Sequence, residues 1–123
     1  MQIKATTGMG NGVFATKSYE SGDTIEICPI IILDTSHRKI IDKTKLYNYY
    51  FSWGKTSDEA AIALGYGSLY NHSYKANAHY IKVLDQDTIR IIALQSIKSG
   101  EEIKVNYNGD PASTKDLWFS VID

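Results

Sequence analysis

The chain has 123 residues, 43% of them hydrophobic, which is enough for one domain with a single core. Its formal net charge of −1 leaves no excess of basic residues, so the composition argues against direct binding to nucleic acid. The single cysteine, Cys28, cannot form an internal disulfide, and with the three histidines it matches no zinc-binding pattern, so we expect no metal site. No apolar run fits a secretion signal or a membrane span, and we therefore expect a cytoplasmic protein that does not bind membranes.

Short strands separated by turns are predicted along the first third of the chain. Residues 2–7 are expected to form a strand and residues 13–17 its return partner, joined by a turn that contains three glycines. Such glycines permit positive φ and close approach of a ligand to the backbone, although a plain hairpin turn explains them as well. Residues 24–33 are β-branched and apolar, and Pro29 within them predicts a break or a sheet edge.

The next segment combines a short helix with an aromatic run. An Asp-Thr-Ser sequence at 34–36 can cap a helix over about 37–45. Residues 47–53 favour a strand, whose period of two would place four aromatic residues on one face: Tyr47, Tyr49, Phe51 and Trp53. Such a face is more often core than site, and both interpretations stay open.

The stretch from Leu69 to Tyr80 is the most unusual part of the sequence. Amide, imidazole and phenol side chains crowd it, with Asn71 and Asn77 as turn-forming residues around His72. An irregular polar segment between apolar runs usually binds a ligand, but an elaborate turn around a structural histidine would look the same.

The remaining chain adds further strands. Residues 81–84 and 88–94 are expected to form a hairpin, and a Gly100 turn leads into a strand on which Ile103, Val105 and Tyr107 share a face. Many short strands, frequent turns and little helix predict a mostly β domain.

Three motifs, in this order, resemble those of the SET-domain protein lysine methyltransferases. They are the glycine-rich entry Gly8-Met9-Gly10-Asn11-Gly12-Val13-Phe14-Ala15, the centre Asn71-His72-Ser73 with Asn77, and the turn Gly100-Glu101-Glu102-Ile103 that leads to Tyr107. The resemblance covers about residues 7–107 and is greatest to the minimal SET proteins of large DNA viruses and their small prokaryotic relatives. One departure is Ala76, where the family has proline.

This resemblance implies a mostly β, β-clip-like SET fold. Small curled sheets with little helix are expected, with the C-terminal segment passing under the Asn71-His72 stretch as a pseudoknot. Residues 1–123 would then form a single SET domain without the zinc-binding modules that flank many larger members.

The resemblance also implies the activity: methyl transfer from S-adenosyl-L-methionine to a lysine of a protein or peptide, with a histone tail among the candidates and S-adenosyl-L-homocysteine as product. The catalytic positions that it implies are Tyr107, Tyr49 and Tyr80. The cofactor-binding positions are Met9, Gly10, Asn11, Asn71, His72 and Tyr107, with Trp118 and Phe119 covering the adenine.

The chemistry of this reaction suits the residues present. Methyl transfer to an amine is an in-line displacement, in which alignment alone can contribute roughly 7–11 kcal/mol. A narrow aromatic channel would remove water from the lysine amine and lower its pKa. Tyr107 would fix the geometry without titrating. The resemblance also implies that Tyr80 restricts the room for a second methyl group, so that monomethyl-lysine is the expected main product; Tyr49 is the alternative for this role.

Alternatives remain at the level of sequence. A catalytically inactive SET-shaped module that binds lysine peptides is the main one. A hydrolase that uses Ser73 and His72 is a poor candidate, because adjacent residues rarely aim their side chains at each other. A homodimer is left open, and a histone substrate in a eukaryotic cell would require a nuclear location.

Overall fold

The computed structural model describes residues 1–115 and 117. The strands are β1 (Gln2–Ala5), β2 (Asn11–Phe14), β3 (Thr24–Leu33), β4 (Phe51–Trp53), β5 (Glu59–Ala63), β6 (Asn71–His72), β7 (Ala78–Val83), β8 (Thr88–Ala93) and β9 (Glu102–Val105). The helical segments are α1 (Thr35–Ile41) and two 3₁₀ turns, η1 (Lys45–Asn48) and η2 (Leu84–Gln86). The expected mostly β fold with little helix is confirmed.

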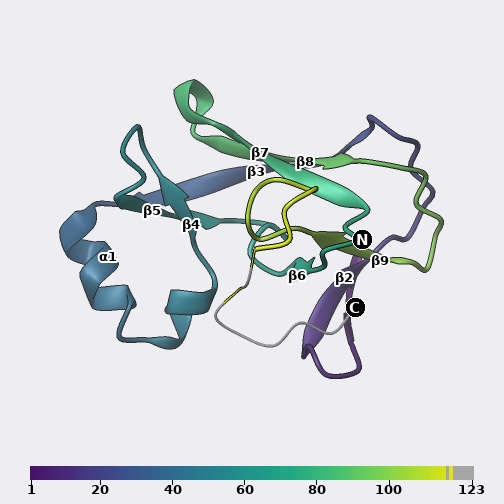
Figure 1. Cartoon of the computed structure of the whole chain (residues 1–123), viewed down its shortest axis with the longest axis horizontal. Helices are drawn as coiled ribbons and strands as arrows, with labels where there is room; N and C mark the ends of the chain where they lie inside the picture. Colours follow the sequence, from purple (N-terminus) through teal and green to yellow (C-terminus); the bar gives the residue numbers. More distant parts are fainter. Residues whose placement is uncertain (116, 118–123) are drawn as a thin grey trace.

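Two curled sheets form the molecule (Figure 1). The smaller sheet has the order β1-β2-β9-β6, and the larger has the order β4-β5-β3-β8-β7. In the part of the chain that the structure describes, no helix is long and apolar enough to cross a membrane.

The smaller sheet joins the central polar stretch to the C-terminal part of the chain. β6 and β9 pair in parallel, with Asn71 opposite Lys104 and His72 opposite Val105. The Ser73 N–H extends this pairing by donating to the Val105 carbonyl at 3.0 Å. The C-terminal segment therefore lies against the Asn71-His72 strand, as the expected pseudoknot requires.

The glycine turn is tighter than the sequence suggested. The Thr6 N–H and hydroxyl both donate to the Gly10 carbonyl at 2.7 Å, and Gly8 and Gly10 adopt φ of 87° and 67°. Because the turn closes so early, Asn11 already pairs with Ala5. The return strand is therefore Asn11–Phe14 rather than 13–17.

The expected break at Pro29 is wrong, because β3 runs without interruption through it. The expected edge is also wrong, because β3 lies between β5 and β8 in the larger sheet. Residues up to Pro29 pair with β8, whereas pairing with β5 begins only at Ile30. Proline has no N–H to donate, and it stands where the strand changes partners.

The aromatic run is a second correction. α1 begins at Thr35, where the Asp34 carboxylate caps the His37 N–H at 3.0 Å, and it ends at Ile41 rather than near residue 45. Residues 45–48 then form η1, so the strand is only Phe51–Trp53. Tyr47 consequently shares no strand face with Trp53: it is 50% exposed, whereas Trp53 is buried.

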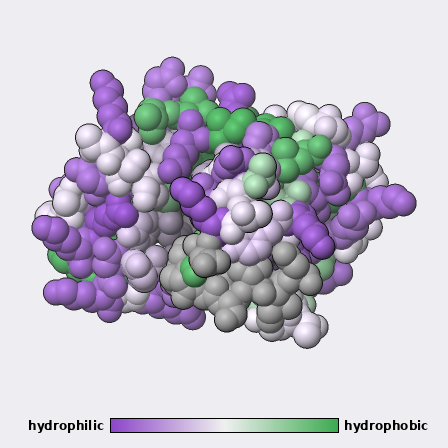
Figure 2. Space-filling model, viewed as in Figure 1, coloured by the Kyte–Doolittle hydropathy of each residue, from purple (hydrophilic) through white to green (hydrophobic). Residues whose placement is uncertain are grey.

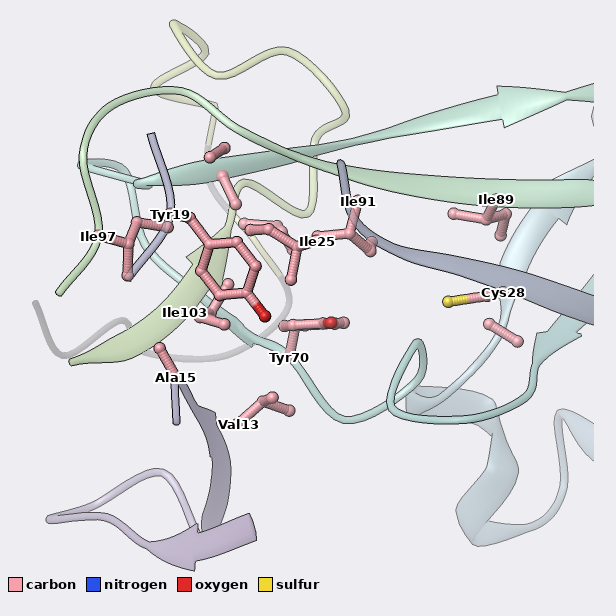
Figure 3. Packing of buried hydrophobic residues seen from close by; sticks show 14 of the residues in the cluster. Val13, Ala15, Tyr19, Ile25, Cys28, Tyr70, Ile89, Ile91, Ile97 and Ile103 are labelled. Carbon is pink, nitrogen blue, oxygen red and sulfur yellow. The ribbon is translucent and has the colours of Figure 1, made fainter. Parts of the chain in front are cut away.

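The core lies where the two sheets meet (Figure 3). Period two is clear in β8, where Ile89, Ile91 and Ala93 are buried and alternate with half-buried residues. Val13 of β2 and Ile103 of β9 pair side by side and are fully buried. Some apolar side chains remain outside and gather along the top of the molecule, over β7 and β8 (Figure 2).

Candidate active site

Tyr107 follows β9 and is tied to the central stretch at two points. Its N–H donates to Nδ1 of His72 at 2.9 Å, and its hydroxyl donates to the Tyr70 carbonyl at 2.5 Å. The His72 ring is fully buried between the rings of Tyr74 and Tyr107, at centroid distances of 4.5 and 5.3 Å. The parallel pairing of β6 with β9 produces this arrangement, because it places the end of β9 beside His72.

An aromatic pocket opens on one side of Tyr107. Its lining carries no charged side chain and encloses about 450 Å³ of empty space, its mouth included. The lining residues are Asn48, Tyr49, Tyr50, Phe51, Gly67, Ser68, Tyr70, Tyr80, Val105 and Tyr107. The structure thus brings together all three residues that the sequence analysis expected at the reacting centre: Tyr49, Tyr80 and Tyr107.

Burial keeps the phenols of Tyr107 and Tyr80 neutral. Burial is the largest cause that raises the pKa of Tyr107, to about 12, and the nearby Tyr49 adds to it. Burial likewise raises the pKa of Tyr80. Near neutral pH both hydroxyls therefore act as hydrogen-bonding groups and not as proton-transfer groups.

Tyr80 is fixed inside this pocket. Its hydroxyl donates to the Tyr107 carbonyl at 3.2 Å, and its ring meets Phe51 edge-on at 4.8 Å. Because both contacts hold the ring, the Tyr80 hydroxyl occupies a defined part of the space that a ligand would enter.

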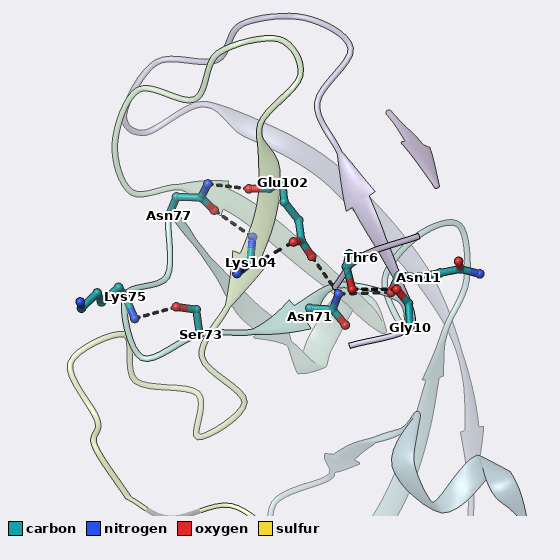
Figure 4. Close-up of polar contacts among 9 residues, drawn as sticks. All are labelled: Thr6, Gly10, Asn11, Asn71, Ser73, Lys75, Asn77, Glu102 and Lys104. Carbon is teal, nitrogen blue, oxygen red and sulfur yellow. Dashed lines mark hydrogen bonds and ion pairs between the residues drawn. The ribbon is translucent and has the colours of Figure 1, made fainter. Parts of the chain in front are cut away.

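The glycine turn meets Asn71, the residue that follows Tyr70 (Figure 4). The Asn71 side-chain amide donates to the Asn11 carbonyl at 3.2 Å and to the Glu102 carboxylate at 2.8 Å. A Cβ on Gly12 would lie 2.3 Å from that carboxylate, so only glycine allows this approach. Asn11 and Asn71 are thus in direct contact, and Met9 and Gly10 precede Asn11 in the same turn.

Two residues that sequence reasoning left without a role support this region. The Asn77 side chain donates to the Glu102 carbonyl and accepts from the Lys104 N–H, both at 2.9 Å. Glu102 accepts from Asn71 and lies 3.9 Å from the Lys104 ammonium (Figure 4). Their signal was present, since both belong to the motifs that carried the resemblance.

Glu26 also supports the site, through Tyr70 and Tyr66, and the sequence analysis did not single it out. Its two carboxylate oxygens accept from the Tyr70 hydroxyl at 2.8 Å and from the Tyr66 N–H at 2.9 Å. Burial, followed by the charge of Glu26, raises the pKa of Tyr70 well above its ordinary value. A lone carboxylate within the apolar run 24–33 was the available signal.

The hydrolytic pair Ser73 and His72, a poor candidate from the sequence, receives no support from the structure either. The Ser73 hydroxyl accepts from the Lys75 N–H at 2.9 Å, and His72 Nδ1 accepts from Tyr107, so the contacts of both hold the chain in place. Across residues 1–115 and 117, no group of three or more His, Cys, Asp or Glu side chains could hold a metal ion. Trp118 and Phe119 lie outside the described residues.

Comparisons with known proteins agree with this geometry. The sequence matches the SET domain family over residues 10–108. It is 30% identical to a histone-lysine N-methyltransferase of Schizosaccharomyces pombe that is specific for lysine 37 of histone H3, over 97% of this chain and 76% of that protein.

Two solved structures are also similar. One is the crystal structure of a candidate histone methyltransferase of Plasmodium falciparum, with a TM-score of 0.65 and 25% identity over 89% of this chain and 97% of the other. The other is a chain of an apo PRC2 structure with mutations in Ezh2, with a TM-score of 0.69 over 85% of this chain and 14% of the other. At 19% identity the second likeness shows the fold alone. With the family match spanning most of the chain, this protein belongs to the SET-domain family of protein-lysine methyltransferases.

Proposed function

We propose that the chain transfers a methyl group from S-adenosyl-L-methionine to a lysine side chain of a protein substrate such as a histone. The observation that carries the proposal is the position of Tyr107. Tyr107 lines the uncharged aromatic pocket, and its hydroxyl donates to the carbonyl of Tyr70, the residue directly before Asn71. Asn71 in turn contacts the glycine turn. In this proposal the aromatic pocket receives the lysine amine. The methyl donor is held by Asn71 and the glycine turn, which we call the cofactor cradle, and the Tyr107 hydroxyl serves both.

The residues of this cradle fit the proposed cofactor. Asn71, His72 and the main chain of Met9, Gly10 and Asn11 would hold it, and the absence of a Cβ on Gly12 lets the turn lie directly against Asn71. S-adenosyl-L-methionine would supply an electrophilic methyl group on a sulfonium. The groups expected beside the sulfonium are the Tyr107 phenol and the Tyr70 carbonyl oxygen, which tolerate a positive charge better than a cationic side chain would. Trp118 and Phe119 remain our candidates for the cover over the adenine.

The protein's own contribution is positioning and desolvation. The Tyr107 hydroxyl donates to the Tyr70 carbonyl, which fixes the direction of its O–H bond. The aromatic lining excludes water from the lysine amine and lowers its pKa, so the neutral, nucleophilic form becomes accessible. No strong base among the lining residues is required, because alignment supplies much of the rate.

The substrate proposal is supported by the relatives, whose descriptions name histone methyltransferases. The uncharged pocket is consistent with it, since a lysine stem packs well against aromatic rings and its amine is held at the far end. The alternative of an inactive binding module has no comparable support, because the tyrosine at position 107 is present and doubly tethered.

The test is a methyl-transfer assay with radiolabelled S-adenosyl-L-methionine, using core histones and cell lysate as acceptors. Tyr107→Phe should lower turnover by about 100-fold, the order of loss expected for misplacement at a reacting centre. Its cofactor affinity, measured by calorimetry, should stay within a few-fold of that of the wild type.

The matched control is Tyr19→Phe, which removes a phenol hydroxyl in the core and outside the pocket. It should retain wild-type turnover. A wild-type rate for Tyr107→Phe would overturn the role of Tyr107. A folded wild-type chain that binds no cofactor and labels no acceptor would overturn the proposed function itself.

A further inference from the structure

The aromatic pocket adjoins a second hollow that has a different character. Four residues line both spaces: Tyr50, Phe51, Tyr80 and Tyr107. The second hollow adds polar and cationic groups: Arg38, Tyr47, Ser52, Lys82 and Asn108. A peptide whose lysine entered the aromatic pocket would have its neighbouring residues in or beside this hollow, which we call the cationic vestibule.

Arg38 is a fixed part of the vestibule wall. Its guanidinium donates to the carbonyls of Ser57 and Glu59 at 2.8 and 3.0 Å, and to the hydroxyls of Tyr50 and Ser52 at 3.0 and 3.2 Å. It also lies over the Tyr50 ring, 4.9 Å from the centroid. All these acceptors are neutral, so they hold the guanidinium in place without cancelling its charge.

Two carboxylates of this region, those of Asp42 and Asp58, bind hydroxyl groups and not the Arg38 guanidinium. Asp42 accepts from the Tyr50 hydroxyl at 2.8 Å, and Asp58 accepts from the hydroxyls of Thr35 and Thr56. No carboxylate of the described chain lies within 4.0 Å of the Arg38 guanidinium. The positive charge of Arg38 is therefore offset only partly.

Lys82 approaches the vestibule from a different element, β7. Its side chain is half-buried, and its ammonium has neither a hydrogen bond nor an ion pair within residues 1–115 and 117. Burial is the main cause that lowers its pKa, and the charge of Arg38 lowers it further. Partial burial of an ammonium beside a second cation costs free energy, and a bound anion would recover it.

We propose that the cationic vestibule binds an acidic side chain of the substrate, a carboxylate or a phosphate close in sequence to the target lysine. This inference deepens the proposed function and rests on it. Arg38 would supply a fixed charge, and Lys82 would supply a mobile donor that reaches the anion. The vestibule would then select among lysines by their neighbours, which the uncharged aromatic pocket cannot do.

The test compares peptides that share one target lysine and differ at the flanking positions. Each peptide carries either alanine, glutamate, phosphoserine or arginine beside the lysine, and a fluorescent label reports binding by anisotropy. We expect the wild type to bind the glutamate and phosphoserine peptides about tenfold more tightly than the alanine peptide, the factor of one charge-assisted hydrogen bond. The arginine peptide should bind most weakly. The two acidic peptides distinguish a carboxylate from a phosphate as the preferred anion.

Lys82→Met keeps the length of the side chain and removes its charge, and it should abolish most of this preference. Lys82→Glu should invert it in favour of the arginine peptide. Lys98→Met, an exposed lysine in the turn before β9, is the matched control and should retain the wild-type preference. Thermal unfolding checks that all variants are folded. Arg38 is left intact because its four hydrogen bonds hold α1 against β4 and β5.

Equal binding of all peptides by the wild type, or an acidic preference that survives in Lys82→Met, would overturn the inference. Because binding is measured without turnover, this result is independent of catalysis. A chain that methylates the alanine and glutamate peptides equally well would retain the proposed function and lose only the vestibule. Preferential binding of the acidic peptides without any methyl transfer would retain the vestibule and count against the proposed function.

Discussion

Individual hydroxyl groups define the interior of the aromatic pocket. The Tyr80 side chain is bonded to the backbone of Tyr107, because its hydroxyl donates to the Tyr107 carbonyl at 3.2 Å. The same hydroxyl faces Gly109, where an added Cβ would lie 3.1 Å away. Val105, two residues before Tyr107, is buried, and it is too small to close the pocket by itself. Tyr80 is thus the residue best placed to limit the room around a methylated amine.

We therefore expect Tyr80→Phe to shift the product from mainly monomethyl-lysine toward dimethyl-lysine. Removal of the hydroxyl frees space and leaves the ring packed against Phe51, so the loss of turnover in the first methylation should be small. Mass spectrometry of a peptide methylated to long times measures the product ratio. Trimethyl-lysine as the main product of the wild type would show that Tyr80 does not restrict the site.

At the scale of the elements, a side chain adds to the contacts that β9 makes with its two neighbouring strands, β2 and β6. The Asn77 amide contacts one carbonyl and one N–H of β9, as an adjacent strand would. It thereby holds β9 beside β6, and that pairing is what delivers Tyr107 to His72. A side-chain clamp of this kind is sensitive, because its loss leaves two buried or half-buried backbone groups without partners.

Asn77→Ala should lower the free energy of unfolding by about 2 kcal/mol, the order expected for two lost hydrogen bonds in a partly buried setting. Asn77→Asp keeps the oxygen that accepts from Lys104 and replaces the donor, so its loss should be similar or larger through repulsion at the Glu102 carbonyl. Urea unfolding measures both. Wild-type stability of Asn77→Ala would mean that β9 is held by the sheet alone.

The elements also show what the sequence could and could not predict. The β-branched apolar run at 24–33 located β3, and apolar runs beside turns located β8 and β9. The strand predicted over 81–84 is Ala78–Val83 in the structure, because its first residues belong to the polar stretch that hid the start of β7. The strand predicted over 47–53 was too long. Aromatic residues favour strands, but the Thr44 hydroxyl accepts from the Leu46 N–H at 3.2 Å and starts a 3₁₀ turn there. Local capping prevailed there over strand propensity.

The site was predictable only in part, and for a different reason. Asn71, His72 and Tyr107 lie in short motifs, and the resemblance identified them. The contact of Tyr107 with Tyr70 spans 37 positions of sequence, and that of Tyr70 with Glu26 spans 44. Contacts of this kind depend on how the two sheets meet, and no local pattern encodes them. The meeting of Arg38 with Lys82 at one hollow has the same origin.

For the molecule as a whole, the junction of the sheets contains several weak acids that are kept neutral. Burial raises the pKa of the Cys28 thiol to about 12, and the charge of Glu26 adds to this. Burial is also the main cause that raises the pKa of Tyr107 to about 12 and that of Tyr70 further. Close packing explains these environments: a Cβ on Gly67 would lie 2.8 Å from the Cys28 sulfur.

These groups predict a loss of stability in alkali. The pKa values in the folded state lie above those of the unfolded chain, which are about 9 for Cys28 and about 10 for the tyrosines. Between about pH 9 and 12 the unfolded state therefore releases protons that the folded state retains, so the free energy of unfolding must fall as the pH rises. Well below about pH 9 both states hold these protons, and these groups contribute no slope.

Urea midpoints measured at about pH 7.5, 9 and 10.5 should consequently fall only slightly from the first to the second, where the unfolded-state thiol is about half ionised, and further at the third. Cys28→Ala should be less stable at every pH because of the cavity it leaves, but its midpoint should fall less between pH 9 and 10.5, since the group with the lowest unfolded pKa is gone. The comparison of slopes separates the thiol from the phenols. A wild-type midpoint that stays constant through pH 10.5 would mean that the thiol and the phenols ionise in the folded state, and that the junction of the two sheets admits solvent.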